Sequence, residues 1–499
     1  MNVESQSYEG SPKRQDLIVL ALAAGLLYFL ALGQRDLWNP NEPIYGRAVA
    51  EMAQDEDWLV PTVNDRVFAE KPILYFWTAL LSAELLGGVN ELSLRVPAAL
   101  AGIASAFLTF AWVLPYVGRR RAFTTAALFA TVYQVFWASR SVQMDIFVLA
   151  STLGVLVPLT HFLDFERPAA RAWLLAGLAA GLGFAAKGPV TLVLPGLVIF
   201  AYALSTRRLT RLLSTHALLG AAVALLVSTP WYLTLWAQGE ASFLHEVLIR
   251  QNFMRFVDAW DHRQPWWYFL KYLWIDYAPW SWLLPAAALT APQGRKEGKL
   301  QRQSWIWIAA ILFFFSLSES KRAPYILPIA PAVAALAAIV VDRSARRLQP
   351  EGAAKVLTGL AFGGLGTVFA LGGLAMLSPW VQIPGQLRTL SYILGILMAA
   401  WGVSILAAQW LVRDRPALAP ALLLYGLTAL YVGASVWVLP AVDPMKSARL
   451  FAGEIDRRVT VPGKPIASYR FWDWRAGYLY YADRTIPNLK RSGQLTAFW

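Results

Sequence analysis

The sequence predicts an all-α polytopic membrane protein, and three observations carry that prediction. Hydrophobic residues make up 57% of the chain and charged residues only 15%, against roughly 25% charged residues in a typical soluble domain. Apolar runs long enough to cross a bilayer recur along nearly the whole length. The 23 Trp and 19 Tyr residues fit the aromatic belts that form at membrane interfaces.

The net charge of +13 comes mostly from Lys and Arg in short loops between the apolar runs. Cytoplasmic loops carry such an excess, so the basic balance indicates orientation in a membrane and no nucleic-acid partner. The chain has no cysteine, which excludes disulfides, thiolate metal sites and cysteine nucleophiles.

The first apolar run, about residues 16–34, follows Lys13 and Arg14 and is longer than the core of a signal peptide. No good small-residue cleavage site follows it, so we predict an uncleaved span with a cytoplasmic N-terminus. The polar stretch that begins at Arg35 then lies outside, in a first periplasmic loop of about residues 35–93. Within it, Tyr45 to Gln54 is predicted to be a short helix.

Residues 72–88 form an apolar run of about the minimum length for crossing, and they decide the side of every later loop. If the run crosses, the basic clusters at Arg119–Arg121, Arg207–Arg211 and Arg343–Arg347 face outward. If it lies flat at the interface, all three clusters face the cytoplasm, as the positive-inside rule requires. We therefore predict a flat juxtamembrane helix here.

Twelve further spans follow from this choice, about thirteen in all. Spans two, three and four fall at about 94–116, 122–138 and 146–163. Spans five and six form a hairpin that turns at Lys187-Gly188-Pro189, and span seven falls at about 216–235. A second long periplasmic loop covers about residues 238–266. Span eight reaches about residue 290, span nine ends near Ser318, and span ten starts near Pro324. The last three lie at about 355–377, 389–412 and 417–439.

The membrane domain thus covers about residues 1–439, and about residues 440–499 form a small α/β periplasmic domain. We predict a helix at about 445–458 and short strands at Pro465–Phe471 and Tyr478–Tyr481. At this size the domain has little core of its own, so we expect it to rest on the membrane domain.

The predicted topology gathers acids and bases that are far apart in sequence at one membrane face. They are Glu42, Glu70, Lys71, Asp145, Lys187, Arg255, Lys321 and Tyr325. Carboxylates can accept a proton from a nucleophile, and Lys and Arg can hold a phosphate. Taken singly, each residue also fits an ordinary role, such as a solvated charge, a helix cap or a snorkelling lysine. No spacing of His and Glu makes a strong metal motif.

Eight short segments carry a further signal. They are Leu37–Tyr45, Asp57–Pro61, Glu70-Lys71-Pro72, Ala138–Asp145, Ala186–Pro189, Asn252–Phe256, His262–Tyr268 and Ser320–Pro328. In this order they resemble the bacterial aminoarabinose transferase and protein O-mannosyltransferase-like family. The resemblance implies a C-type glycosyltransferase fold in the bacterial inner membrane, with flat juxtamembrane helices in the first outer loop. It also implies transfer of a sugar from undecaprenyl phosphate to lipid A or another envelope acceptor at the periplasmic face.

The resemblance also implies roles for named residues. Lys71, Arg255 and Tyr325 would bind the carrier phosphate, and Glu42 and Asp145 would be the catalytic carboxylates, with the choice of base between them open. The remaining substrate-pocket residues would be Asn41, Tyr45, Lys187, His262 and Lys321. Glu70 would be a candidate ligand of a divalent cation, the one cofactor considered, whose requirement stays open.

Three positions depart from the family pattern. Asn41-Glu42 stands where the aminoarabinose transferases carry Asp-Glu, and because an amide cannot act as a base, the expected base moves to Glu42. Ile44 replaces an expected arginine, and Arg250 stands where a metal-binding histidine is expected. Because of these departures the expectation is for the wider family, with either aminoarabinose or a related sugar as the donor group.

The expected chemistry is a single inverting displacement at the sugar, without a covalent enzyme intermediate. The main rival is a polyprenyl-linked lipid or sugar transporter without chemistry, which would favour paired repeats and a site at the bilayer midplane. The sequence shows no convincing internal repeat, and its polar residues gather at one face. A purely structural partner in envelope assembly would leave that gathering unexplained.

Overall fold

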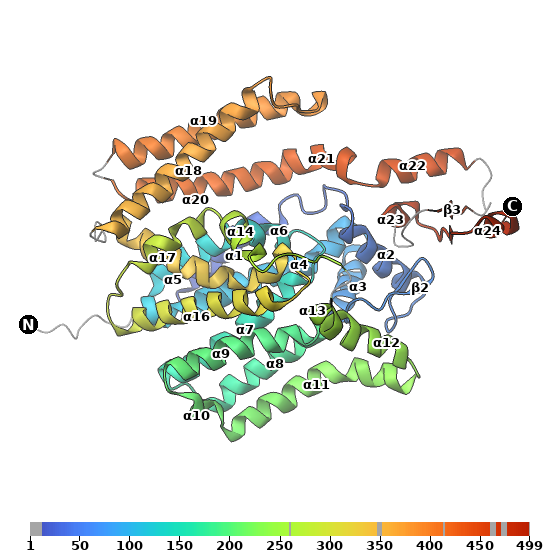
Figure 1. Ribbon diagram of the computed structural model, residues 1–499, viewed down its shortest axis with the longest axis horizontal. Helices are drawn as coiled ribbons and strands as arrows, with labels where there is room; N and C mark the ends of the chain where they lie inside the picture. The colour runs from blue at the N-terminus through green and yellow to red at the C-terminus, as the bar shows by residue number, and fades with distance from the viewer. Residues whose placement is uncertain are drawn as a thin grey trace, which may run out of the picture.

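The computed structural model describes residues 12–258, 261–346, 352–412, 415–459, 466–470 and 477–498. Most of its helices run along the long axis of the molecule in three groups (Figure 1). The central group comprises α1 (Arg14–Phe29), α4 (Glu91–Val117), α5 (Arg119–Ala130), α6 (Tyr133–Ser139), α7 (Asp145–Phe165), α16 (Arg295–Leu317), the 3₁₀ helix η3 (Ala323–Ile329) and α17 (Ala330–Ala345).

Two groups flank the centre, one below it and one above it in Figure 1. The lower group comprises α8 (Ala169–Lys187), α9 (Val190–Ser205), α10 (Leu209–Leu212) and α11 (Thr215–Ala237). The upper group comprises α18 (Ala353–Leu377), α19 (Gly385–Trp410), α20 (Leu418–Gly433), the π-helical turn η4 (Ala434–Val438) and α21 (Leu439–Lys446). Between α13 (Arg255–Val257) and α16 the chain forms α14 (Tyr268–Asp276), the 3₁₀ turn η2 (Trp280–Leu283) and α15 (Leu284–Ala288).

Nine helices among the described residues are long and apolar enough to cross a membrane, so the chain is a multi-pass membrane protein. The predicted spans in α1, α5–α6, α9 and α14–α15 are shorter or broken. At 16 residues, α1 and α9 each rise roughly 24 Å, less than the roughly 30 Å of a bilayer core.

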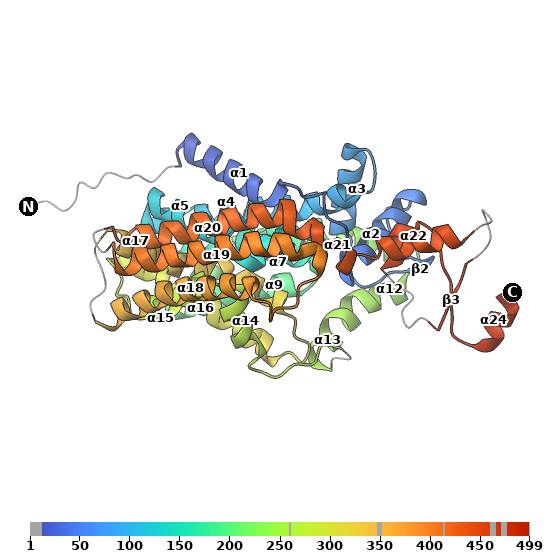
Figure 2. The ribbon, with the colours of Figure 1, turned by 90° about the horizontal axis from the view of Figure 1, so that it is seen from above.

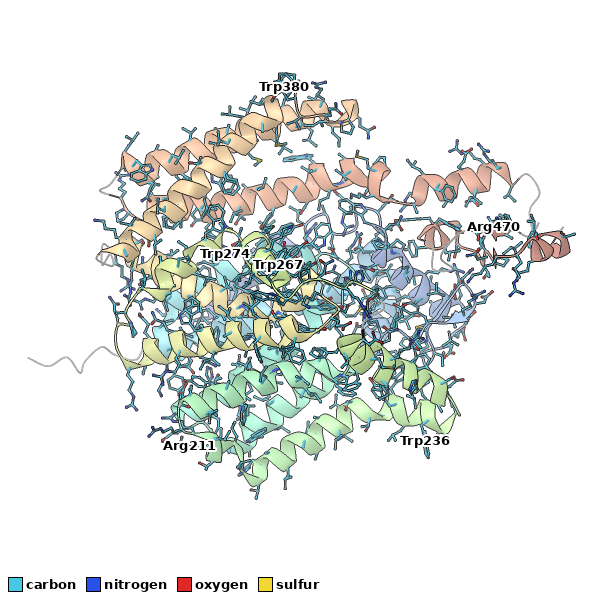
Figure 3. All side chains as sticks on the ribbon, in the orientation of Figure 1. Arg211, Trp236, Trp267, Trp274, Trp380 and Arg470 are labelled. Atoms are coloured by element: carbon cyan, nitrogen blue, oxygen red, sulfur yellow. The ribbon has the colours of Figure 1, made fainter. Side chains whose placement is uncertain are left out.

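The basic loops share one end of the molecule, called the basic end below, as the predicted topology requires. Arg121 binds Glu297 at 2.5 Å and Asp342 at 2.6 Å, which joins α5, α16 and α17. Arg208 and Lys299 bind Asp164 at 3.2 and 3.0 Å. Figure 3 places Arg211 at this end, with Trp236 and Arg470 at the opposite one.

The opposite end, called the site end below, is built from loop helices and two small sheets. Its elements are α2 (Asn41–Gln54), β1 (Thr62–Val63), β2 (Arg66–Val67), α3 (Leu74–Leu86), α12 (Ala241–His245), the π-helix η1 (Glu246–Met254), α13 (Arg255–Val257), α22 (Arg449–Arg458), β3 (Ser468–Tyr469), α23 (Tyr478–Ala482), β4 (Asn488–Leu489) and α24 (Ser492–Phe498). Strands β1 and β2 pair antiparallel across Asn64-Asp65, and β3 and β4 pair parallel.

Helix α3 lies across the direction of α4 and does not extend the bundle (Figure 2). Its 13 residues rise roughly 20 Å, too little to cross a bilayer core of roughly 30 Å. Tyr75 and Phe76 are buried against the protein, while Leu81 and Leu85 are 55% and 76% exposed. One buried face and one exposed apolar face are typical of a helix at a membrane interface.

The C-terminal segment shares its core with the first loop. Tyr478, Leu479 and Ile486 join α2 and α3 in one apolar cluster. Asn64 Nδ2 donates to the Ile486 carbonyl at 3.0 Å and its Oδ1 accepts from the Ile486 N–H at 2.8 Å. The segment therefore rests on the membrane domain, as its small size predicts.

Two details of the predicted C-terminal segment are wrong. Tyr478–Tyr481 begins helix α23 and forms no strand, because Tyr478 and Leu479 turn together into the shared core. The helix expected at about 445–458 is split, with α21 ending at Lys446 and α22 starting at Arg449. The strand predicted at Pro465–Phe471 is observed as β3, and its two terminal residues lie outside the described part.

Candidate active site

A cavity of about 560 Å³ lies at the site end, where α7 begins and α8 ends. That volume falls within the roughly 300–1,000 Å³ of small-molecule sites. The titratable residues that line it are Glu70, Lys71, Asp145, Lys187, Arg255 and Tyr325. All six are among the residues that the sequence predicts to share one face, and they come from five separate segments of the chain.

Helix ends position one ion pair of the pocket. Asp145 is the first residue of α7 and Lys187 is the last residue of α8. The helix macrodipole favours an anion at a helix N-terminus and a cation at a C-terminus, so both charges are placed favourably. Lys187 Nζ lies 2.5 Å from Asp145 Oδ1 and 5.2 Å from the centre of the Tyr325 ring. Gly188, at φ +78°, provides the turn that ends α8 here.

Lys71 carries a charge that its surroundings oppose. Its Nζ donates to the Glu70 carbonyl at 3.0 Å, and it forms no ion pair with the described residues. Burial lowers the pKa of Lys71, and Lys187 and Arg255 lower it further against the opposing effect of Glu70, so that it lies at about 8. Because a bound anion would relieve this clustering of positive charge, the pocket is suited to a phosphate.

Arg255 follows the π-helix η1 and forms an ion pair with Asp261 through one guanidinium nitrogen. Its Nη2 lies 3.0 and 2.7 Å from the two carboxylate oxygens of Asp261, and Nη1 donates to Gln251 at 3.3 Å. A phosphate could replace this carboxylate as the anionic partner of Arg255.

The other side of the pocket is apolar. The lining there comes from α9, η1, α16 and η3, with Val190, Val193, Phe253, Phe314 and Pro328. A cationic end joined to an apolar wall suits an amphipathic ligand with an anionic head.

Glu42 does not line this pocket. Its two oxygens accept from Arg35 at 2.6 and 3.0 Å, from Arg95 at 3.1 and 3.3 Å, and from the N–H groups of Trp38 and Val142 at 2.9 and 3.0 Å. Burial raises the pKa of Glu42, but Arg95 and Arg35 lower it more, so that it lies at about 2. These contacts tie α2 to α4 and to the loop before α7, so the structure supports a scaffold role for Glu42 and leaves its predicted catalytic role to be tested.

The remaining predicted pocket residues also lie outside the lining. Tyr45 packs against Phe68, Tyr75 and Phe76, and Asn41 opens α2. Four predicted pocket residues therefore lie at the site end without lining the cavity: Asn41, Tyr45, His262 and Lys321.

Lys321 and His262 hold the loop between α13 and α14 against the chain that follows α16. Lys321 Nζ donates to the carbonyls of Gln264, at 3.1 Å, and Ser318. The backbone N–H of Lys321 donates to the His262 carbonyl at 3.0 Å.

A metal centre is not evident among the residues that the structure describes, where no three His, Cys, Asp or Glu side chains gather to hold an ion. Glu70 lines the pocket. Arg250, at the position where a histidine was expected, forms an ion pair with Glu246 at 3.0 Å.

Sequence reasoning missed the partners of the predicted residues. Arg35 and Arg95, which hold Glu42, are separated by a loop and two helices, and no local pattern links them. Asp261 was visible only as one of several charges in the second long loop. Asn252 was part of a recognised segment, and it lines the pocket with its side chain against Gly188.

The fold and the comparisons with known proteins define the class of protein, an integral membrane glycosyltransferase. The family model for dolichyl-phosphate-mannose-protein mannosyltransferases matches residues 70–234. The crystal structure of ArnT from Cupriavidus metallidurans bound to undecaprenyl phosphate has the same fold, with a TM-score of 0.77 and 22% identity, covering 98% of this chain and 88% of that chain.

Sequence relatives identify the family more closely. An undecaprenyl phosphate-α-4-amino-4-deoxy-L-arabinose arabinosyl transferase of Pectobacterium carotovorum is 33% identical over 391 residues, which cover 76% of this chain and 68% of that protein. The protein of the same name from Erwinia tasmaniensis is 30% identical over 462 residues, 90% of this chain and 77% of that protein. The chain belongs to the family of these arabinosyl transferases.

Proposed function

We propose that this protein transfers 4-amino-4-deoxy-L-arabinose, or a closely related sugar, from undecaprenyl phosphate to lipid A or another envelope acceptor. The observation that carries the proposal is the pocket, in which Lys71, Lys187 and Arg255 converge beside an apolar wall. Such a pocket matches a carrier that joins a phosphate to a long hydrocarbon chain. The names of the sequence relatives supply the sugar and the carrier.

The carrier phosphate binds between Lys71 and Arg255, with the Tyr325 hydroxyl as a further donor. Arg255 already binds an anion, the Asp261 carboxylate, through Nη2, and the phosphate takes the place of that carboxylate. Lys71 supplies a point charge whose proton is held more firmly once the anion is bound. As the sugar leaves, these cations stabilise the negative charge that develops on the phosphate oxygen.

Asp145 is the better placed of the two candidate bases, because it lines the pocket and Glu42 does not. The acceptor oxygen attacks the anomeric carbon of the sugar, and the bond from that carbon to the phosphate oxygen breaks. The electron pair stays on the phosphate, which leaves as undecaprenyl phosphate. Where the acceptor is a hydroxyl, its proton passes to Asp145, and Lys187 orients that carboxylate. Where the acceptor is an ionised phosphate oxygen, no proton is transferred.

The displacement is a single inverting step, so no sugar becomes attached to the enzyme. Incubation of the purified protein with donor alone, followed by mass spectrometry of the intact chain, tests this. A covalent sugar adduct would exclude the single displacement.

The topology that accompanies this function has about thirteen spans in the bacterial inner membrane. Nine of these spans are the long apolar helices, and α1, α5–α6, α9 and α14–α15 supply the other four. The basic end faces the cytoplasm, and the pocket and the small C-terminal domain face the periplasm. A divalent cation at Glu70 is the one cofactor to test, by comparing turnover with and without a chelator.

The deciding experiment supplies purified protein in lipid nanodiscs with undecaprenyl phosphate-linked aminoarabinose and lipid A. We expect cleavage of the carrier–sugar bond and a modified acceptor, and we expect Lys71→Ala and Arg255→Ala to abolish both. Lys446→Ala is the matched control, because Lys446 is exposed at the site end and outside the pocket. Movement of intact donor across a bilayer without cleavage would favour a transporter. Mass spectrometry of lipid A from a deletion strain tests the acceptor.

A further inference from the structure

A second cavity, of about 820 Å³, opens toward the basic end between α4, α7 and α8. We call it the basic-end groove, and its lining includes Leu108, Leu114, Val157, Leu175, Leu178 and Leu182. It takes no part in the chemistry proposed above, which lies at the other end of the same helices. We propose that the groove binds one anionic phospholipid of the surrounding leaflet, with an acyl chain along α8 and the phosphate at Arg167 and Arg171.

The depth of the groove matches one leaflet. Leu182 lies eleven residues after Arg171 along α8, a rise of roughly 16 Å. Half of a bilayer core is roughly 15 Å thick. A lipid whose headgroup lies beside Arg171 therefore has a chain that reaches Leu182.

The wall of the groove is open to hydrocarbon. Leu175, Leu178 and Leu182 lie on one face of α8 and are 43%, 43% and 42% exposed. Behind these leucines α7 and α8 pack closely, since a Cβ added at Gly154 would lie 2.6 Å from the Ala179 Cβ. The one polar ring in the wall is already satisfied, because His161 Nε2 lies 3.0 Å from the Trp112 carbonyl oxygen.

The mouth of the groove is positively charged. Arg167 and Arg171 both line it, and both are exposed. Among the described residues neither guanidinium has a carboxylate partner, and no acidic residue lines the groove. The neighbouring acid, Glu166, is instead 3.7 Å from Arg211. Two arginines at headgroup depth therefore favour an anionic phosphate over a zwitterionic headgroup.

Native mass spectrometry of the full chain tests the proposal, after incubation with equal amounts of phosphatidylglycerol and phosphatidylethanolamine of the same acyl chains. We expect one phosphatidylglycerol to be retained in preference. Arg167→Gln/Arg171→Gln should lower its affinity about 25-fold, at about fivefold for each arginine. Leu178→Trp should lower it as well, by filling the groove without a change in charge.

The matched control is Arg120→Gln/Arg302→Gln, which removes two charges from the same end but outside the groove. It should keep wild-type affinity. Equal loss in both double variants, equal retention of the two lipids, or unchanged binding in the groove variants would overturn the proposal. Displacement of phosphatidylglycerol by undecaprenyl phosphate would assign the groove to the carrier instead. Tighter lipid binding in Glu4→Gln/Glu9→Gln would also count against the proposal, because it would mean that these two acids, and not a lipid phosphate, are the usual partners of Arg167 and Arg171.

Discussion

Replacing Glu42 by Gln separates a scaffold role from a catalytic one. The carboxylate lies among Arg35, Arg95 and two backbone N–H groups, and it is 5% exposed. The glutamine amide keeps the shape of the side chain but loses the charge. Its NH₂ group cannot accept hydrogen bonds from the arginine N–H groups that the carboxylate oxygen bound. Removing one partner of a buried ion pair costs about 3–5 kcal/mol, because the other charge stays buried.

The pKa of Glu42 gives an independent magnitude. Its decrease from 4.5 to about 2 corresponds to about 3 kcal/mol of stabilisation, at 1.36 kcal/mol for each pKa unit. Because the folded-state pKa is the lower one, this stabilisation is present above about pH 4.5 and is lost as the pH falls through about 2. The stabilisation of about 3 kcal/mol from the pKa decrease thus agrees with the cost of about 3–5 kcal/mol for breaking a buried ion pair.

The assay measures the thermal unfolding midpoint of the detergent-solubilised protein together with turnover of the folded fraction. We expect Glu42→Gln to lower the midpoint by several degrees and to lose activity only in proportion to the loss of folded protein. Glu454→Gln is the control, because Glu454 lies in α22 at the same end and its ion pairs with Arg457 and Arg458 are on the surface. An unchanged midpoint with turnover reduced by about a hundredfold or more would refute the scaffold role and restore Glu42 as the base.

Three further predictions concern the pocket and its cover. The kcat/KM for the donor should fall as the pH rises through about 8, because Lys71 then loses its proton; initial rates from pH 6 to about 10 test this, and Lys71→Arg should remove the decline. Asp145→Asn should lower kcat by about 10²- to 10⁴-fold with a hydroxyl acceptor, and single-turnover rates that match the wild type would exclude Asp145 as the base. Gly477→Ala should loosen the C-terminal segment, because the added Cβ would overlap the Asn39 side chain, and limited proteolysis should then cut there faster than in a Gly493→Ala control, where the Cβ meets no neighbour.

The gathering of the site residues at one end was predictable, because it follows from the charge of the loops on either side of a short apolar run. Once that run was placed outside the bilayer, Lys71, Asp145, Lys187 and Arg255 had to share a face. The partners of the buried polar side chains were harder to predict from the sequence. The position of Glu42 in a recognised motif does not reveal which way its side chain points, and Arg95 is 53 residues away in sequence.

Short aromatic runs were also ambiguous. Tyr478–Tyr481 has four bulky residues and too little length to separate a strand period from a helical one. Its neighbours in the first loop decided the outcome, since the helix turns Tyr478 and Leu479 to the same side, where the shared core lies. No sequence pattern near residue 478 indicates that this segment packs against the first loop.

The core that joins the first loop to the last residues also sets the order in which the protein can be completed. Helix α2 leaves the ribosome early, but Leu479 and Ile486, which cover it, are made after every membrane span. Until then the apolar side of α2 and the Asn64 side chain have no native cover, so nascent chains should remain protease-sensitive at the first loop until synthesis ends. A chain stopped just after α20 would insert its spans and still lack a finished outer end.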